Sequence, residues 1–399
     1  MNESVTAVPR QAASTIHGAV LLLAAVLPVM AIVSLVPVIP LLGKEFSAVP
    51  GSEFLVPMAV TIPALCVALF SPLAGWLSDR VGRKLLLIIA LLLYAVFGVL
   101  PYFMSDLMRI IISRVGLGVT EAVIMTVATA MLGDYFQGEE RKRWIALQVA
   151  LLSLAAIVLI TVGGVLGETL GSRGPFLLYL IALPVALIVT LVLFEPEVRE
   201  QHTEAEIDEK FPFTKVLPLV VITFVAAVLF YTIVVELGAL LTVIGVTSPA
   251  VIGAVGAGVN FGHVTGSFIF HRLKSWSGPA LLVVGFGIAA AGYLSIGLSH
   301  NLPTRAASTF FASVGVGVLL PSLLAWIMRE LPAQFRGRGT GFWTGTFFLG
   351  QFVAPIMAVV LSDQLGGDLI NVVFLYSLLA AAVALISVIF ARRQAVGHA

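Results

Sequence analysis

Three ionisable residues stand inside long apolar stretches of the sequence: Arg114, Glu121 and Glu236. A charge at the centre of a bilayer costs at least about 2.5 kcal/mol, so such residues need partners or a water-filled cavity. Burial disfavours a charged carboxylate and a nearby arginine favours it, and a carboxyl balanced in this way can exchange a proton. We therefore expect proton coupling at Glu121 and Glu236. Arg114 would tune Glu121 or bind an anionic substrate.

The residues that follow Arg114 recur at helical spacing. Gly118, Glu121 and Met125 lie at i+4, i+7 and i+11, which places all four residues on one face of one helix. We expect that face to line a central cavity. Two alternatives stay open. Arg114 and Glu121 could neutralise each other as a structural pair, and Glu236 could simply reach the membrane surface.

Other polar and aromatic side chains within apolar stretches are candidates for the wall of the same cavity. For Gln148, Gln351 and Trp343, packing between helices is at least as good an explanation, and a membrane histidine is more often a helix–helix hydrogen-bonding residue than a proton carrier. With the charged residues and Met125 named above, the predicted substrate site contains Gln148, Tyr231, Asn260, His263, Trp343 and Gln351.

The elements that must position these residues are membrane helices. Of the 399 residues, 59% are hydrophobic and 11% are charged, whereas a soluble domain carries about 25% charged residues. The mean hydropathy is +1.08. So few polar residues cannot cover a water-soluble protein of this size, and we expect an all-α membrane protein.

A helix needs about 20 apolar residues to cross the hydrocarbon core. The sequence contains twelve such runs, at 18–42, 54–77, 85–104, 107–133, 144–168, 175–194, 217–243, 250–271, 279–299, 306–328, 339–362 and 369–391. The first run is too long for the apolar part of a signal peptide, so we interpret it as a spanning helix.

Basic residues indicate the orientation of these helices. If both termini are cytoplasmic, only Lys44, Arg109, Arg173 and Arg305 lie on the outer side, and the cytoplasmic loops hold most of the other basic residues. This bias is typical of a multi-pass protein of the cell inner (cytoplasmic) membrane with both termini inside.

One charged stretch divides the chain into two halves. We expect a cytoplasmic tail (1–17), a six-helix bundle (18–194), a solvated cytoplasmic linker (195–216), a second six-helix bundle (217–391) and a short cytoplasmic tail (392–399). Both halves place a glycine-containing helix end and then a basic loop after their second helix. This repetition is typical of transporters built from two related halves.

The loop after the second helix carries the most specific motif. It reads Gly75-Trp-Leu-Ser-Asp79-Arg80-Val-Gly82-Arg83-Lys, and it resembles the G-x-L-x-D-R-x-G-R-K signature of the major facilitator superfamily. Further resemblances lie in Arg114 with Gly118, in Asp134-Tyr135-Phe136 with Glu139, Glu140 and Arg141, and in Leu331-Pro332 with Arg336, Gly337 and Gly341.

The resemblance implies a fold and a gate. The fold would be twelve helices in two six-helix bundles with pseudo-two-fold symmetry, with a site between them. Asp79 would cap the start of the eleventh helix in the outward-facing state, and it would pair locally with Arg83 and Asp134. The predicted gating residues are Gly75, Asp79, Arg80, Gly82, Arg83 and Asp134.

The resemblance also implies a secondary transporter similar to drug–proton antiporters. The few polar residues favour amphipathic or lipophilic substrates, so we expect proton-coupled efflux of the multidrug type. Many such antiporters carry G-P-x-x-G-G in the fifth helix. Here Gly163 and Gly164 are present, but Leu159 and Ile160 replace Gly-Pro. Proton-coupled uptake of a small organic acid or another metabolite, and a non-transporting receptor of the same fold, stay open.

Several function classes are not expected. The sequence holds no G-x-x-x-x-G-K-[ST] phosphate loop, no H-E-x-x-H or Cys/His cluster and no G-x-S-x-G motif, which argues against an enzyme, a metal site and an ATP-driven pump. We expect no cofactor and no nucleic-acid partner. The expected partners are a small-molecule substrate, protons and the lipid bilayer, and we expect a monomer. The single cysteine, Cys66, cannot form an intramolecular disulfide.

Overall fold

The structure, a computed structural model, describes residues 13–196, 212–332 and 335–396. The described residues form helices and connecting turns, with no strand among them. The first half contains α1 (Thr15–Val33), η1 (Val36–Val38), α2 (Ile39–Glu45), α3 (Ser52–Val81), α4 (Arg83–Phe103), α5 (Leu107–Tyr135), α6 (Gly138–Leu170), η2 (Gly174–Ile181) and α7 (Ala182–Val192).

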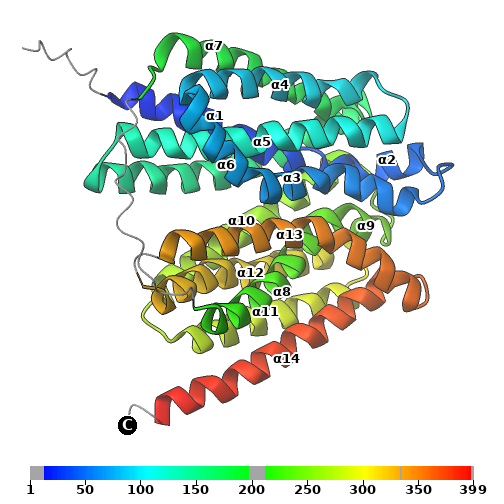
Figure 1. The fold of residues 1–399 in the computed structure, drawn as a ribbon. Coiled ribbons are helices and arrows are strands. Elements are labelled where there is room, and N and C mark those ends of the chain that lie inside the picture. Colours follow the sequence, from blue (N-terminus) through cyan, green and yellow to red (C-terminus); the bar gives the residue numbers. More distant parts are fainter. Residues whose placement is uncertain (1–12, 197–211, 333–334, 397–399) are drawn as a thin grey trace, which may run out of the picture.

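The second half repeats this pattern of long helices. It contains α8 (Phe213–Val235), α9 (Leu237–Thr242), α10 (Pro249–Leu273), α11 (Gly278–Leu298), α12 (Leu302–Glu330), α13 (Arg336–Gln364) and α14 (Leu369–Val396). Figure 1 shows the halves as two helical layers, with α1–α7 above and α8–α14 below. The prediction of an all-α membrane protein with two bundles is confirmed.

Eleven of the described helices are long and apolar enough to cross a membrane. The twelfth predicted run corresponds to α10, which is long enough, at 25 residues, but less apolar. It contains Asn260, His263 and several glycines, and it packs between α6 and α12. A helix packed between two others can carry such residues on the faces that meet protein, and Phe261 and Phe268 are exposed on its remaining face.

The two bundles have the same orientation, so that their corresponding ends lie on the same side of the molecule (Figure 1). The helix α1 begins and α14 ends at the left side of Figure 1, and the short helices α2 and α9 lie at the opposite side. We call the first side the linker end, because α7 ends and α8 begins there, and the second side the far end.

Two predicted spans are interrupted, contrary to the continuous runs expected at 18–42 and 217–243. The first breaks after α1, where Pro37 and Pro40 each lack the N–H that would continue a helix. The second breaks at Glu236, between α8 and α9, with no proline there. The span expected at 175–194 begins as the 3₁₀ helix η2. Interrupted helices in transporters commonly lie beside a binding or gating region.

The outward surfaces of the peripheral helices are apolar. Leu187 and Leu191 on α7, and Leu378 and Leu385 on α14, are among the most exposed large side chains. Exposing such an apolar surface to water is unfavourable, whereas contact with lipid chains is favourable. The tail and linker predicted at 1–17 and 195–216 lie largely outside the described residues, whereas α14 continues to Val396, into the tail predicted at 392–399.

Candidate functional site

Arg114 joins three other segments of the first bundle to α5. Its Nε donates a hydrogen bond to the carbonyl of Ala59 on α3 at 3.1 Å, and its Nη1 donates to Tyr179 Oη on η2 at 2.7 Å. Its Nη2 donates to the carbonyl of Ala31 on α1. The side chain is 0% exposed. In this conformation the guanidinium therefore acts as a cross-link, and a ligand cannot reach it.

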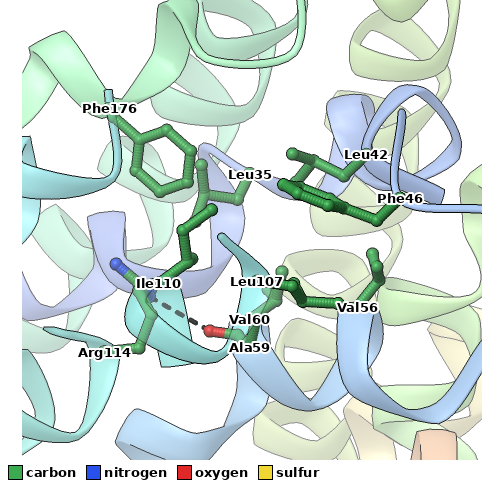
Figure 2. A pocket seen from close by; sticks show the side chains of 10 residues that line it. All are labelled: Leu35, Leu42, Phe46, Val56, Ala59, Val60, Leu107, Ile110, Arg114 and Phe176. Atoms are coloured by element: carbon green, nitrogen blue, oxygen red, sulfur yellow. Dashed lines mark hydrogen bonds between the residues drawn. The ribbon is translucent and has the colours of Figure 1, made fainter. Parts of the chain in front are cut away.

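A small pocket lies beside Arg114 toward the far end. Figure 2 shows Arg114 with the apolar side chains of Phe46, Ile110 and Phe176 around this space, and the dashed line marks the bond to Ala59. Its volume is about 10 Å³, room for about one water molecule. A pocket this small and apolar supports packing and does not hold a substrate.

Glu121 lies two turns from Arg114 on the same helix and is 5% exposed. Among the described residues the two side chains form no ion pair, and Glu121 Oε2 has no hydrogen-bond partner. Its carboxyl lies within electrostatic reach of Tyr231 on α8, in the other bundle. No direct ion pair with Arg114 is observed, although Arg114 also lies within electrostatic reach, and Glu121 stands as a buried acid with Tyr231 of the other bundle nearby.

The predicted cavity face of α5 is closed along its first part. A side chain at Gly118 would place its Cβ 2.6 Å from Pro63 Cα and 2.7 Å from Cys66 Cβ, so glycine is needed for the close approach of α3. Arg114 and Gly118 therefore pack against α3, contrary to the expectation that they line a cavity. Met125, further along the same face, is half-buried.

An aromatic wall forms in the second bundle from Phe230, Tyr231, His263, Trp343 and Phe347. The His263 ring stacks on Phe230 with 3.9 Å between centroids. Phe347 lies 5.0 Å from Tyr231 and 5.6 Å from Trp343. Sequence reasoning selected Tyr231, His263 and Trp343 but missed the two phenylalanines that connect them, because phenylalanine is common in every apolar run.

The remaining predicted polar residues do not join this wall by any hydrogen bond. Asn260 Nδ2 donates to the carbonyl of Gly256 on its own helix at 3.0 Å. Gln148 Nε2 donates to Thr129 Oγ1 on α5 at 3.2 Å. Gln351 is buried on α13. For Gln148 the explanation by packing between helices therefore fits this conformation, whereas Asn260 is bonded within its own helix.

Glu236 occupies the break between α8 and α9. Its side chain is buried, and Oε1 has no hydrogen-bond partner among the described residues. Burial is contrary to the alternative in which Glu236 reaches the membrane surface. The second predicted acid is thus an interior group at a helix interruption.

At the linker end, the predicted local charge relay is present. Arg83 donates to Asp79 at 3.2 Å and forms an ion pair with Asp134. Arg80 lies 4.0 Å above the ring of Trp76. The Asp79 side chain is 57% exposed. The predicted contact of Asp79 with the start of α13 belongs to the outward-facing state and stays a prediction.

Gly82 and Glu195 belong to the same predicted gating region. Gly82 has φ +98°, a conformation that favours glycine, and it begins α4. Glu195 accepts hydrogen bonds from the backbone N–H groups of Arg83, at 2.5 Å, and Lys84, at 2.9 Å. A carboxylate is favoured at a helix N-terminus. Glu195 was expected in a solvated linker, and no local sequence signal reveals that it caps α4, far away in the chain. A Cβ added at Gly75 would lie 3.7 Å from Thr126 Cγ2 of α5.

At the far end the two bundles touch through glycines. A Cβ at Gly164 of α6 would lie 2.6 Å from the carbonyl oxygen of Pro249 and 3.1 Å from Gly253 Cα on α10. A Cβ at Gly238 of α9 would lie 2.6 Å from Pro40 on α2. The bundles are therefore in backbone contact at this end.

A carboxylate fastens the same contact. Ser248 Oγ, at the N-cap of α10, donates to Glu168 Oε2 of α6 at 2.7 Å. The backbone N–H of Ala250 also points to this oxygen, at 3.4 Å. By contrast, α13 near the linker end is open at Gly341 and Gly345, where an added Cβ would meet nothing within 4 Å. The conformation is thus closed at the far end.

Comparison with known proteins agrees with this architecture. The family profile described as Major Facilitator Superfamily matches residues 21–277 and 219–398. The chain belongs to the major facilitator superfamily. The resemblance inferred from the loop at Gly75–Lys84 is therefore confirmed, and the chain is a transporter of this family similar to drug–proton antiporters.

Among superfamily relatives, Multidrug resistance protein 1 of Bacillus subtilis is 24% identical over 336 residues, covering 82% of this chain and 85% of that protein. Tetracycline resistance protein, class H, of Pasteurella multocida is 28% identical, but the match covers only 48% of this chain and 47% of that protein. The Bacillibactin exporter of Bacillus subtilis is 32% identical over only 27% of each chain.

Solved superfamily structures show the same fold. The inward-facing, occupied structure of a bacterial homologue of the human lysosomal transporter Spinster has a TM-score of 0.75 at 14% identity, covering 94% of this chain and 97% of that one. The D-xylose–proton symporter has a TM-score of 0.74 at 15% identity, with the same coverage.

Proposed function

We propose that this transporter exports small amphipathic or lipophilic molecules in exchange for protons. The observation that carries the proposal is Glu121, a buried carboxyl without an ion-pair partner, within electrostatic reach of Tyr231 across the bundle interface. A carboxyl in this place can be neutral in one conformation and charged when the other conformation admits water. Such a difference in protonation couples a proton to the conformational change.

The substrate would bind against the aromatic wall. Stacked rings offer a large apolar surface with few fixed polar contacts, which suits lipophilic molecules of different shapes. The names of relatives, which include multidrug resistance and multi-drug efflux proteins, support this substrate class. Glu121, across the interface from Tyr231, would also attract a substrate that carries a positive charge.

Alternating access would connect the two ends. In our proposal the linker end is cytoplasmic, the protein lies in the cell inner membrane as a monomer, and the conformation described here is inward-facing. The contact between Gly164 and Gly253 closes the far end in this state. In the opposite state, Asp79 would cap the start of α13 and close the linker end.

Proton-coupled uptake is the second candidate. The structural similarity to the D-xylose–proton symporter and the shared fold are compatible with it. The form in which Arg114 binds an organic acid is less well supported, because the guanidinium is fully buried and its three nitrogens donate to Ala59, Tyr179 and Ala31.

The test uses purified protein in liposomes with a panel of lipophilic cations and neutral dyes. A proton gradient is imposed in either direction, and substrate movement is followed by fluorescence. Exchange predicts that substrate moves against the direction of proton flow. Substrate that accumulates together with protons would support uptake, and a protein that moves no solute would support the receptor.

The matched variants are Glu121→Gln and Glu53→Gln. Glu121→Gln should abolish gradient-driven transport and keep the binding of neutral substrates, because glutamine preserves the shape but cannot exchange the proton. Glu53 is exposed in the first turn of α3, so Glu53→Gln should behave as the unmodified protein. Full coupled transport by Glu121→Gln would remove Glu121 as the proton carrier.

A further inference from the structure

The two bundles repeat one internal hydrogen bond. In the first bundle, Tyr94 of α4 donates to the carbonyl of Leu27 on α1 at 2.5 Å. In the second, Tyr293 of α11 donates to the carbonyl of Leu229 on α8, also at 2.5 Å. Each tyrosine thus binds the helix that is interrupted in its own bundle. This pair of bonds gives a register for comparing the two halves residue by residue.

A second tyrosine repeats in the same register. The rings of Tyr94 and Tyr179 lie 5.3 Å apart in the first bundle, and those of Tyr293 and Tyr376 lie 6.1 Å apart in the second. Tyr376 of α14 is therefore the counterpart of Tyr179. The helix breaks also correspond, because Ser34 follows α1 as Glu236 follows α8.

The counterpart of Arg114 is not a cation. The stretch Arg114-Val-Gly-Leu-Gly118 on α5 corresponds to Ser313-Val-Gly-Val-Gly317 on α12. Ser313 is buried and donates its only hydroxyl proton to the carbonyl of Thr309, one turn back. The second bundle thus keeps the tyrosine that accepts from Arg114 in the first bundle, but it has no guanidinium there.

Three buried oxygens around this place have no hydrogen-bond partner among the described residues: Tyr376 Oη, Thr232 Oγ1 and Glu236 Oε1. Their side chains are 1%, 0% and 8% exposed. The Thr232 hydroxyl lies close to the hydroxyls of both Tyr376 and Tyr293 but without the geometry of a hydrogen bond to either, and Tyr376 is in turn within electrostatic reach of Glu236. Thr232 and Glu236 are also one turn apart and joined by a backbone hydrogen bond of 3.0 Å. Unsatisfied buried oxygens in such a group are costly unless a ligand or proton meets them.

We propose that the second bundle binds a monovalent metal cation of the sodium class at the break between α8 and α9, through Glu236, Thr232 and Tyr376. A hard cation prefers oxygen ligands, and the carboxylate and two hydroxyls supply three of them. Carbonyls at the end of an interrupted helix commonly complete such sites in transporters.

The charge of the site selects the class of cation. Glu236 is the only carboxylate of the three ligands, so a monovalent ion gives a neutral cluster, whereas a divalent ion would leave a net positive charge in a buried place. The described residues contain no group of three or more His, Cys, Asp or Glu side chains suited to a metal ion. A transition metal or a divalent ion is therefore not favoured.

The site would also hold together the segments that meet at the interruption. Thr232 precedes the break, Glu236 lies at it, and Tyr376 belongs to the peripheral helix α14. The bound cation thus does in the second bundle what the Arg114 guanidinium does in the first, where it joins α1 to η2. Sequence analysis expected Glu236 to carry a proton, and protonation of Glu236 alone is the competing outcome.

The experiment measures thermal unfolding of the purified full chain in detergent. Sodium chloride is titrated against choline chloride and potassium chloride at constant ionic strength and pH. A sodium site predicts a saturable rise in Tm of at least about 3 °C that choline does not produce. Binding of radioactive ²²Na⁺ to the same protein gives a second readout that does not depend on unfolding.

Matched pairs of variants locate the site. Glu236→Gln and Tyr376→Phe should abolish the sodium-dependent rise and lower ²²Na⁺ binding at least about tenfold. Tyr179→Phe changes the counterpart of Tyr376 in the first bundle, Glu121→Gln changes the buried acid of that bundle, and both variants should retain both signals. If Glu236→Gln does not fold, Tyr376→Phe tests the site alone, because it removes one oxygen and keeps the ring.

Three results would overturn the proposal: no sodium-specific stabilisation, a sodium effect that Glu236→Gln and Tyr376→Phe both retain, or a Tm that responds to pH but not to sodium. The last result would assign Glu236 to a proton. Sodium binding and thermal unfolding are measured without transport substrate or proton gradient. A negative result would therefore reject the sodium site and leave the proposed export function to its own test.

Discussion

Arg114 Nη1 donates a hydrogen bond to Tyr179 Oη at 2.7 Å, and Tyr179 Oη in turn donates to the carbonyl of Ala31 at 3.3 Å. Arg114 also donates to that carbonyl directly. A closed set of contacts therefore fixes α5, η2 and α1 relative to one another. A buried hydrogen-bond network stabilises a protein only when each of its donors and acceptors has a partner. Removing one donor from this network should therefore lower the stability measurably.

Arg114→Lys should destabilise the protein by about 2 kcal/mol, because a lysine ammonium cannot reproduce three donors in a planar fork. Thermal unfolding in detergent would show a lower Tm, and transport would fall with it. Arg109→Lys is the matched control, since Arg109 is exposed on the same helix. Equal Tm values for the two variants would contradict the cross-linking role.

Gly164→Leu should open the far end. The new side chain cannot fit where a Cβ already lies 2.6 Å from the carbonyl oxygen of Pro249, so the conformation closed at this end loses stability. The equilibrium should shift toward the opposite conformation. Gly258→Leu, on the same helix as Gly253, is the control, because a Cβ at Gly258 meets nothing within 4 Å.

The shift is measured by maleimide labelling of a single cysteine. Val38→Cys in a Cys66→Ser background places a thiol at the far-end contact, where Val38 is 0% exposed. Labelling should be faster in the presence of Gly164→Leu and unchanged in the presence of Gly258→Leu. Slow labelling in both would mean that Gly164 does not hold the far end closed.

Asp79→Asn should lower transport at least about tenfold with little change in Tm. In the conformation described here, Asp79 is exposed and, among the described residues, forms an ion pair with Arg83 alone, and exposed pairs contribute about 0–1 kcal/mol. We expect the substitution to destabilise mainly the opposite conformation, where the Asp79 carboxylate would cap α13, and transport would fall for that reason. Glu139→Gln, which removes an exposed pair with Lys142 at the same end, should leave transport unchanged. A large fall in Tm for Asp79→Asn would show that Asp79 mainly stabilises the conformation described here, contrary to the prediction.

Glu195→Ala should lower stability by about 1–2 kcal/mol, because two backbone N–H groups at the start of α4 lose their acceptor. Hydrogen exchange at the amides of Arg83 and Lys84 should become faster, and Tm should fall. Glu140→Ala, at an exposed position on α6, is the control. Unchanged exchange at the two amides would remove Glu195 as the cap of α4.

Much of the fold could be predicted from the sequence, because apolar runs of spanning length and basic loops are local signals. The loop around Asp79 was specific enough to indicate the family. The breaks after α1 and at Glu236 were not predictable in the same way, because an apolar run looks the same whether its helix is continuous or interrupted. Pro37 and Pro40 give a local signal for the first break, but Glu236 gives none for the second.

The candidate site was predictable in composition but not in arrangement. The spacing of Arg114 and Glu121 placed both on one face of α5, yet only the packed structure shows that Arg114 bonds to three segments while Glu121 forms no ion pair. Tyr179 and Glu195 act on residues far away in the chain, which no local pattern reveals. The repeated tyrosines become visible only when their hydrogen bonds align the two halves.

Tyr94 and Tyr293 each bind an interrupted helix to the rest of its bundle, on the side of the break where α1 and α8 lie. The short helices α2 and α9 lie beyond the breaks and are not held by these two hydrogen bonds. A helix that is fixed before a break can change direction at the break, so the segment after it can move as a hinged unit. The short helices α2 and α9 are therefore free to shift at the far end before the contact between α6 and α10 separates. Opening of the far end would then begin at these two short helices and finish when Gly164 and Gly253 part.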